Sequence, residues 1–137
     1  MDNSTTRLHD VFFYGLYMDE EILKSKNVVP RNKRIAIAYG YKLRIGNMAT
    51  LLREENAKAY GLLYALTHNE IDTLYKNAGL TQYVTEALSV ELKDGSSISA
   101  LCCNLLIPPK DDESNSEYHN KLIKCMEHYN LPISENV

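Results

Sequence analysis

The chain has 137 residues, of which 45% are apolar and 24% charged, and its formal net charge is −3. This length predicts a single domain, and the apolar share excludes an intrinsically disordered chain. The longest basic run is the short segment Arg31-Asn32-Lys33-Arg34. Nucleic-acid-binding proteins need an extended basic surface to replace the counterions of the phosphates, so we expect no nucleic-acid partner.

The aromatic composition is unusual, with ten Tyr, two Phe and no Trp. The chain therefore fills its need for aromatic volume mainly with a side chain that carries a hydroxyl. A buried Tyr hydroxyl needs a hydrogen-bond partner. We expect a core or cavity with more polar contacts than is usual.

The three cysteines are Cys102, Cys103 and Cys125. None of them shows the Cys-x-x-Cys or Cys-His spacing of a metal site, which predicts buried free thiols in a reducing compartment. The first ten residues are polar, and no apolar stretch reaches the roughly 18 residues that span a bilayer. We therefore expect a soluble, cytoplasmic protein that does not contact membranes.

No other pattern of metal ligands is present. The four histidines are His9, His68, His119 and His128. They share no motif, and we expect them all at the surface. The sequence thus predicts neither a metal ion nor a cofactor.

The chain begins with a polar segment, residues 1–9, which is expected to be a flexible tail. The apolar run 10–14 predicts a buried strand that enters a tight turn at Gly15. A short helix is expected over 19–26, with Asp19 as its N-cap and acidic residues in its first turn.

The clearest strand is predicted over 34–45, where apolar residues alternate with other residues for twelve positions. Gly40 is a natural place for a bend or bulge in a strand of this length. Residues 46–47 predict a turn, 48–52 a returning strand, and 54–56 a polar loop.

Residues 57–66 are apolar on both faces and predict a central strand. The strand ends in Thr67-His68-Asn69-Glu70, which matches the Ser/Thr-x-x-Glu capping box. A helix is expected to follow, with Ile71 and Leu74 facing the core, and to end near Ala78-Gly79.

A hairpin is predicted next, from alternating residues over 83–93, the turn signal Asp94-Gly95 and a strand over 97–107. A second capping box, Ser114-Asn115-Ser116-Glu117, opens a C-terminal helix over about 115–130. The whole order predicts an α+β domain over residues 10–137. Its sheet is expected to be a small mixed β-barrel of five to seven strands flanked by helices.

Several segments together resemble one family. Residues 12–18, Phe-Phe-Tyr-Gly-Leu-Tyr-Met, resemble the Tyr-Gly-Ser-Asn/Leu glycine loop of the gamma-glutamylcyclotransferase-like family. Residues 36–44 resemble its second strand, and 59–67 resemble its Val-x-Gly-x-x-Tyr-x-Leu-Thr strand. Residues 70–74 resemble the following helix, and the hairpin comes in the same order. The resemblance covers residues 10–105, and it rests on order and spacing more than on any one motif.

The resemblance implies a small β-barrel with a cavity lined by the glycine loop. Backbone N–H groups of that loop hold a γ-glutamyl carboxylate or the developing oxyanion. A glutamate acts as acid and base while the substrate closes to 5-oxoproline. The matching positions imply a ligand site formed by Tyr14, Gly15, Leu16, Tyr17 and Tyr83.

The chain departs from the family pattern at two positions. Leu16 replaces the serine of the glycine loop, which removes a hydroxyl but keeps the backbone N–H. The Glu-Gly that the family carries near the helix end is Ala78-Gly79 here. Because alanine cannot transfer a proton, the usual cyclotransferase chemistry lacks its acid and base.

Glu86 is the candidate for a relocated carboxylate. It shares one face of its predicted strand with Val84, Leu88 and Val90, so it is expected to point inward. A carboxylate is rarely buried without a partner, and such a group is either a catalytic acid and base or a structural partner of Arg44 or of a tyrosine. A bulge that turns Glu86 to water is a third interpretation. Arg44 either holds a ligand carboxylate or is solvated.

Two functions remain open. The first is an enzyme, of transferase or lyase type, that binds a small γ-glutamyl amine or amino-acid-like ligand and uses Glu86 to form 5-oxoproline. The second is a catalytically inactive small-molecule-binding or protein-interaction module of the same fold, either monomeric or homodimeric. A carboxylate within reach of the glycine-loop amides decides between them, because proton transfer requires hydrogen-bond distance.

Overall fold

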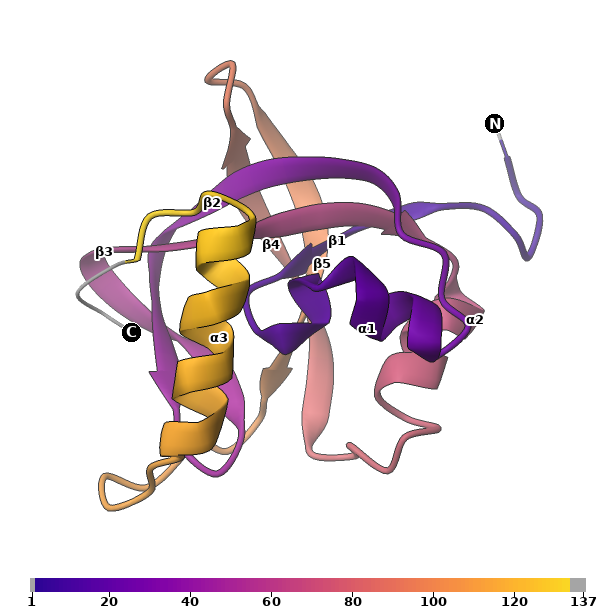
Figure 1. Ribbon diagram of the computed structural model, residues 1–137. Helices are drawn as coiled ribbons and strands as arrows, with labels where there is room; N and C mark the ends of the chain where they lie inside the picture. Colours follow the sequence, from indigo (N-terminus) through magenta and orange to yellow (C-terminus); the bar gives the residue numbers. More distant parts are fainter. Residues whose placement is uncertain (1, 134–137) are drawn as a thin grey trace.

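The protein folds into a closed five-stranded β-barrel (Figure 1), and the computed structural model describes residues 2–133. The last four residues of the predicted domain, 134–137, lie outside the described residues. The strands are β1 (His9–Phe13), β2 (Arg31–Ile45), β3 (Ala49–Leu66), β4 (Tyr83–Leu92) and β5 (Ser97–Leu105). Their order around the barrel is β1-β3-β2-β4-β5, and only the β1–β5 pair is parallel among the described pairs. The predicted mixed α+β barrel is thus confirmed.

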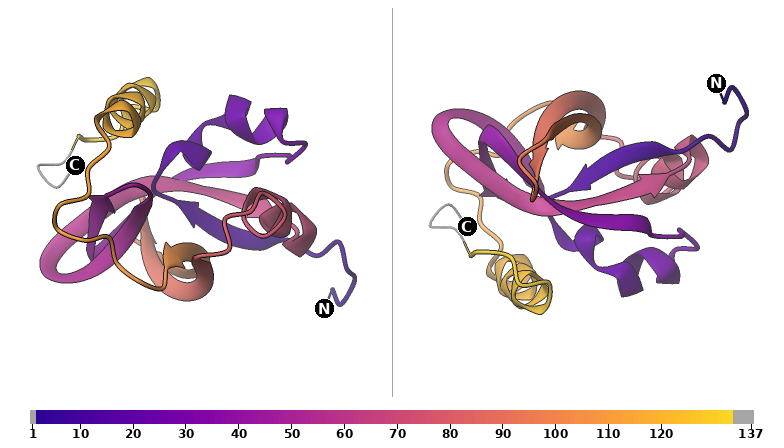
Figure 2. Two further views of the ribbon diagram at one scale, coloured as in Figure 1. Left: turned by 90° about the horizontal axis from the view of Figure 1, so that it is seen from below. Right: turned by 90° about the horizontal axis from the view of Figure 1, so that it is seen from above.

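Three α-helices flank the barrel, and α1 and α3 lie on the same side of it (Figure 2). They are α1 (Glu20–Ser25), α2 (His68–Leu74) and α3 (Ser116–His128). Asp19 caps α1 as predicted, because its side chain accepts from the N–H of Glu21. The predicted cap of the last helix is wrong, since Asn115 and not Ser114 accepts from the first turn. Within residues 2–133, no helix combines the length and the apolar character needed to cross a bilayer.

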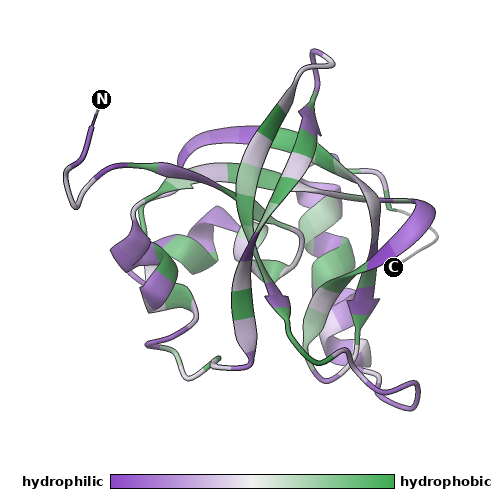
Figure 3. Cartoon of the chain, turned by 180° about the vertical axis from the view of Figure 1, so that it is seen from behind, coloured by the Kyte–Doolittle hydropathy of each residue, from purple (hydrophilic) through white to green (hydrophobic). Residues whose placement is uncertain are grey.

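The core forms where β3 runs between β1 and β2. All residues from Gly61 to Leu66 are buried, as expected for a central strand with covered faces. Gly61 lies against the backbone of β1, so closely that a Cβ atom there would overlap Phe13 O and the ring of Phe12. Figure 3 shows hydrophobic stretches along the barrel strands, whereas the N-terminal segment is hydrophilic.

A β-bulge at Gly40 reverses the buried face of β2. The register against β3 shifts between Tyr39 and Tyr41, and Gly40 has a φ of +82°. Before the bulge the small residues Ala36 and Ala38 face the core, and after it Leu43 does. The predicted bend is therefore confirmed. Because a bulge changes the alternation by one residue, one apolar period could not describe the whole strand.

The predicted polar loop over 54–56 is wrong. These residues belong to β3, which continues beside β2 through pairs such as Tyr41 with Arg53 and Ile45 with Ala49. Residues 53–56 form the exposed part of this ribbon, and Lys42 forms an ion pair with Glu54 there, with 3.7 Å between Nζ and Oε2. Polar side chains suit a two-stranded segment exposed to water as well as they suit a loop, so composition did not distinguish the two.

The expectations for tyrosines and cysteines hold in the core. The buried Tyr64 hydroxyl donates to the carbonyl of Met18 over 2.6 Å. Cys102, Cys103 and Cys125 are free and buried. Burial raises the pKa of the Cys125 thiol to about 12, and it also raises the thiol pKa values of the other two. All three thiols therefore stay protonated and unreactive at neutral pH.

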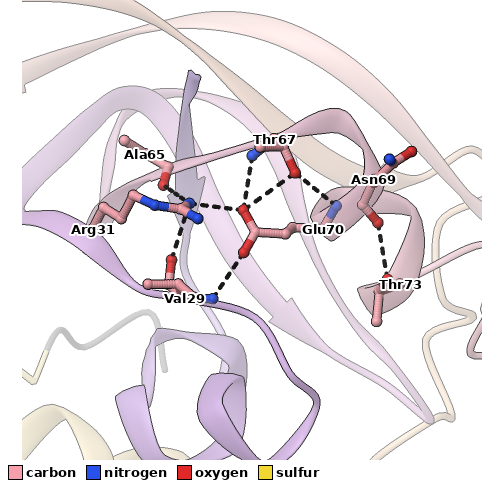
Figure 4. Close-up of polar contacts among 7 residues, drawn as sticks. All are labelled: Val29, Arg31, Ala65, Thr67, Asn69, Glu70 and Thr73. Atoms are coloured by element: carbon pink, nitrogen blue, oxygen red, sulfur yellow. Dashed lines mark hydrogen bonds and ion pairs between the residues drawn. The ribbon is translucent and has the colours of Figure 1, made fainter. Parts of the chain in front are cut away.

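Glu70 joins β2, β3 and α2 at one end of the barrel (Figure 4). Its carboxylate accepts from Arg31 Nη1 at 2.8 Å, from Thr67 N at 3.0 Å and from Val29 N at 2.8 Å. Thr67 and Glu70 complete the predicted capping box of α2. Burial alone would raise the pKa of Glu70, but the hydrogen bonds from Arg31, Thr67 and Val29 outweigh it and lower the pKa.

Candidate functional site

The turn after β1 begins the candidate site. Gly15 leads from the buried end of β1 into a single 3-10 turn, Leu16–Met18. Its φ is −115°, so the backbone there does not require glycine. A Cβ atom at Gly15 would lie well inside 3.0 Å of the Tyr118 hydroxyl, so any other residue at this position would displace that side chain. Glycine is favoured here by this close approach and not by a positive φ.

Tyr118 brings α3 onto this turn (Figure 1). The N–H of Leu16 donates to the Tyr118 hydroxyl oxygen over 3.1 Å. Tyr118 stands in the first turn of α3, and the Asn115 cap fixes that turn by accepting from the Tyr118 N–H over 3.0 Å. The glycine-loop N–H that the family resemblance assigns to a ligand is thus bonded to a side chain of the same protein.

The Tyr118→Phe substitution removes this acceptor. We expect it to lower the free energy of unfolding by about 1 kcal/mol, because the part-buried Leu16 N–H loses its partner. Amide exchange at Leu16 should accelerate. Urea unfolding and amide exchange measure the two effects. Tyr39→Phe is the matched control, because the Tyr39 side chain is 52% exposed. Unchanged Leu16 exchange in Tyr118→Phe would contradict the role of the hydroxyl.

A cavity of about 350 Å³ opens beside the turn. Five tyrosines line it, namely Tyr14, Tyr17, Tyr75, Tyr83 and Tyr118. The remaining lining residues are Phe13, Gly15, Leu16, Ile22, Asn47, Met48, Ala49 and Leu80. We call this space the tyrosine cavity. Its volume lies at the lower end of the range of ligand pockets, about 300–1,000 Å³.

Three of these tyrosines direct their hydroxyl protons to backbone carbonyls. Tyr14 donates to Cys103 O at 2.7 Å, and Tyr17 donates to Leu74 O at 2.7 Å. Tyr83 donates to Ala49 O at 2.5 Å. These bonds tie the end of β1 to β5, the 3-10 turn to the end of α2, and β4 to β3, so the rings have fixed positions around the cavity.

The cavity wall carries no charge from its tyrosines. Burial raises the pKa of Tyr14 and Tyr75 well above the usual range. It also raises the pKa of Tyr17, Tyr83 and Tyr118. A tyrosine acts as a base only when its pKa is lowered toward the working pH, so these five hydroxyls are neutral hydrogen-bonding groups.

The rings of the wall contact one another in series. Tyr17 and Tyr75 pack edge to face, with ring centroids 5.4 Å apart. Tyr75 and Tyr83 follow at 5.2 Å in a tilted arrangement, and Phe13 packs on Tyr17 at 6.3 Å. Edge-to-face pairs of this kind stabilise a fixed arrangement of aromatic side chains.

The structure brings together five of the predicted site residues around this cavity, namely Tyr14, Gly15, Leu16, Tyr17 and Tyr83. Arg44 does not line it. The Arg44 guanidinium donates to the carbonyls of Ile45, Lys110 and Glu113, the last two at 2.6 and 2.9 Å. Arg44 therefore holds the loop before α3, which is neither of the roles expected from the sequence.

Glu86 also does not line the cavity, and its expected burial is wrong. Leu88 and Val90 of the same face are buried as predicted, but Glu86 is exposed and accepts from Asn104 Nδ2 over 3.3 Å. β4 pairs with β2 only at Leu92 and Glu91. Beyond these two pairs no residue of β2 pairs with β4 in the described chain, and Glu86 lies in this part of β4 with its side chain exposed to water.

No carboxylate lines the tyrosine cavity among residues 2–133. The predicted α2 ends at Leu74 instead of Ala78, and an irregular segment leads from there to β4. Ala78 is exposed in that segment. Neither the position of the missing family glutamate nor Glu86 therefore brings a proton acceptor to the glycine loop.

Two tyrosines of the wall were not identified from the sequence as site residues. Tyr118 is spaced with Leu122, Cys125 and Met126 as on one apolar face of a helix, which is typical of an ordinary core position. Tyr75 directly follows α2 and carries no motif. Both tyrosines reach the cavity because segments that are distant in the sequence come together in the fold. The only sign of them in a single sequence is the high number of tyrosines.

The histidines differ in part from their expected surface positions. His9 and His119 are partly buried, and the His9 ring lies 4.1 Å from that of His68 between centroids. In the described part of the chain, no three His, Cys, Asp or Glu side chains come together as possible metal ligands. This pair therefore does not form a metal centre with protein ligands alone.

Comparison with known proteins gives a likeness in structure only. No family model matches the sequence, and no curated protein matches it. A gamma-glutamyl cyclotransferase structure superposes with a TM-score of 0.74 at 17% identity, covering 92% of this chain and 82% of that one. A yeast gamma-glutamyl cyclotransferase specific to glutathione gives a TM-score of 0.65 at 13% identity, covering 96% and 91%.

An AIG2-like protein from Mus musculus gives a TM-score of 0.60 at 17% identity, covering 85% of this chain and 94% of that one. The barrel and its helices are therefore those of the gamma-glutamyl cyclotransferase fold. At these identities the likeness establishes the fold, and the chemistry must be argued from the residues of the cavity.

Proposed function

We propose that this protein, which has the gamma-glutamyl cyclotransferase fold, binds a small molecule in the tyrosine cavity and does not form 5-oxoproline. One observation carries the proposal: five tyrosines and the glycine loop enclose a cavity that has no carboxylate among the described lining residues. A mostly apolar pocket with a few fixed polar groups is the usual form of a small-molecule site.

The chemistry of ring closure supports the second half of the proposal. The α-ammonium of a γ-glutamyl compound must lose a proton before its nitrogen attacks the γ-carbonyl. Ala78 cannot accept this proton, and burial raises the pKa of the tyrosines of the wall. Of the two functions left open by the sequence, the geometry therefore favours the binding module.

The first experiment measures turnover. The full chain is incubated with glutathione, γ-glutamyl anilide and γ-glutamyl butylamine, and 5-oxoproline is measured by chromatography. We expect no product above the protein-free blank. Product that disappears in a Glu86→Gln variant would contradict the proposal and restore the enzyme with a relocated carboxylate.

The second experiment measures binding. A library of small organic compounds is screened by thermal shift, and binders raise the melting temperature because they stabilise only the folded state. Met48→Trp, which fills the cavity, should abolish the shifts. The control Ile107→Trp should preserve them, because Ile107 is exposed and lies outside the cavity. Absence of any binder, or binding that persists in Met48→Trp, contradicts the proposal.

A further inference from the structure

We infer that the ligand of the tyrosine cavity is an uncharged, mostly apolar molecule that contains a ring and a neutral polar group such as an amide. This inference rests on the proposed function and names the class of molecule bound there. It excludes zwitterionic amino-acid-like and γ-glutamyl ligands from the cavity.

The described residues of the cavity wall are all uncharged. None of the described lining residues is Asp, Glu, Lys, Arg or His. An ion that enters such a cavity loses hydration and finds no opposite charge to replace it. Arg44 is not available to a carboxylate, because its guanidinium is already bonded to three carbonyls.

One backbone N–H group of the glycine loop already has a partner within the protein. A ligand carboxylate in this fold needs backbone N–H donors, but the Leu16 N–H already donates to Tyr118 Oη. An anion at the Leu16 N–H would have to displace the Tyr118 hydroxyl, which lies where a Cβ atom of any other residue at position 15 would be. The Leu16 N–H is therefore already bonded to a neutral group from the protein itself.

The tyrosine hydroxyls of the wall keep hydrogen-bonding capacity for a ligand. The protons of Tyr14, Tyr17 and Tyr83 are directed to carbonyls, but the oxygens keep lone pairs that accept from a ligand N–H or O–H. The Tyr118 hydroxyl accepts from Leu16, and its own proton has no acceptor among the described residues. It is free to donate to a ligand carbonyl, so an amide matches both capacities.

The shape of the cavity wall favours a ligand that contains a ring. The rings of Tyr17, Tyr75 and Tyr83 contact one another in series along the wall. Aromatic walls pair with a further ring in edge-to-face or offset arrangements. A volume of about 350 Å³ limits the occupant to a compact molecule.

Three probes of the same carbon frame and different charge test the inference. They are 3-phenylpropionamide, 3-phenylpropionate and 3-phenylpropylammonium, titrated into the full chain at neutral pH by calorimetry. We expect the neutral amide to bind at least about tenfold more tightly than either ion. Met48→Trp should remove this binding.

A charge placed in the wall should change the preference. Leu80→Lys adds a cation to the cavity and should bring the carboxylate probe to equal or tighter binding than the amide. Met48→Lys is the second variant if Leu80→Lys does not fold. The matched control is Leu106→Lys, because Leu106 is 72% exposed and outside the cavity, and it should keep the wild-type order.

Each outcome decides the inference. Tighter binding of either charged probe than of the amide, abolished by Met48→Trp, overturns the inference but leaves the proposed binding function standing. If both lysine variants keep the wild-type order of affinities for the three probes, the inference is also overturned, because the charge of the wall then does not determine which ligand binds. Absence of binding by all three probes overturns it as well, and the library screen decides separately whether the cavity binds other molecules.

Discussion

Replacing Gly61 by alanine is expected to lower the free energy of unfolding by about 3 kcal/mol. A Cβ atom at this position would overlap the backbone oxygen of Phe13 and come within 2.8 Å of the Phe12 ring. β1 cannot move away, because it is paired to β3 from His9 with Leu66 to Phe13 with Leu62. The clash therefore falls on the strand pair that carries the chain into the glycine loop, and ligand binding should weaken together with stability.

Urea unfolding at neutral pH measures this effect. Gly95→Ala is the comparison, because Gly95 has a φ of +86° and no atoms near the site of its missing Cβ. It isolates the cost of a side chain in the left-handed region, about 1 kcal/mol. A Gly61→Ala protein as stable as Gly95→Ala would show that β1 and β3 can separate without loss.

The Glu70→Gln substitution is expected to lower the free energy of unfolding at neutral pH by about 2 kcal/mol. The carboxylate receives hydrogen bonds from Arg31, Thr67 and Val29, and the Glu70 side chain is only 13% exposed. Glutamine keeps one oxygen but loses the charge that balances Arg31. The control Glu21→Gln removes an exposed pair with Lys24 and should cost less than about 0.5 kcal/mol.

The effect of Glu70 should depend on pH in a defined direction. Its pKa in the folded protein is lowered from 4.5, so the unfolded chain takes up the proton at higher pH. The stabilisation is therefore fully present above about pH 4.5 and is lost as the pH falls through the lower, folded-state value. Urea unfolding of wild type and Glu70→Gln from pH 7 to pH 3 should show curves that converge at the acidic end. A constant difference would contradict the assignment.

Local patterns were sufficient to predict most of the barrel. Alternation identified the strands, Gly40 marked the bulge, and Thr67 with Glu70 marked the start of α2. The length of β3 was missed because Glu54, which is part of the exposed ribbon, has the composition of a loop. Alternation of apolar and polar residues shows which face of a strand is buried. A two-stranded ribbon that is exposed to water on both faces has no such alternation, so this pattern cannot identify it.

Among the residues that line the cavity, those of the glycine loop were predicted from one continuous segment, and Tyr83 was added by the family resemblance. Tyr14, Gly15 and Tyr17 follow one another along the chain, and they lie together at the cavity. Glu86 illustrates the limit, because the inward face of its strand was assigned correctly for Leu88, but the exposure of Glu86 depends on where the pairing of β2 with β4 ends. Where two strands stop pairing is determined by the whole sheet, and it cannot be predicted from the periodicity of one strand.

The central claim is that the tyrosine cavity is the ligand site and accepts an uncharged molecule. The most direct measurement is a titration of ¹⁵N-labelled protein with 3-phenylpropionamide, followed through the backbone amide signals. We expect saturable shifts at Leu16, Tyr17 and Ala49, which surround the cavity. Shifts confined to the groove at residues 92–94 and 128–130, with the glycine-loop signals unmoved, would contradict the account.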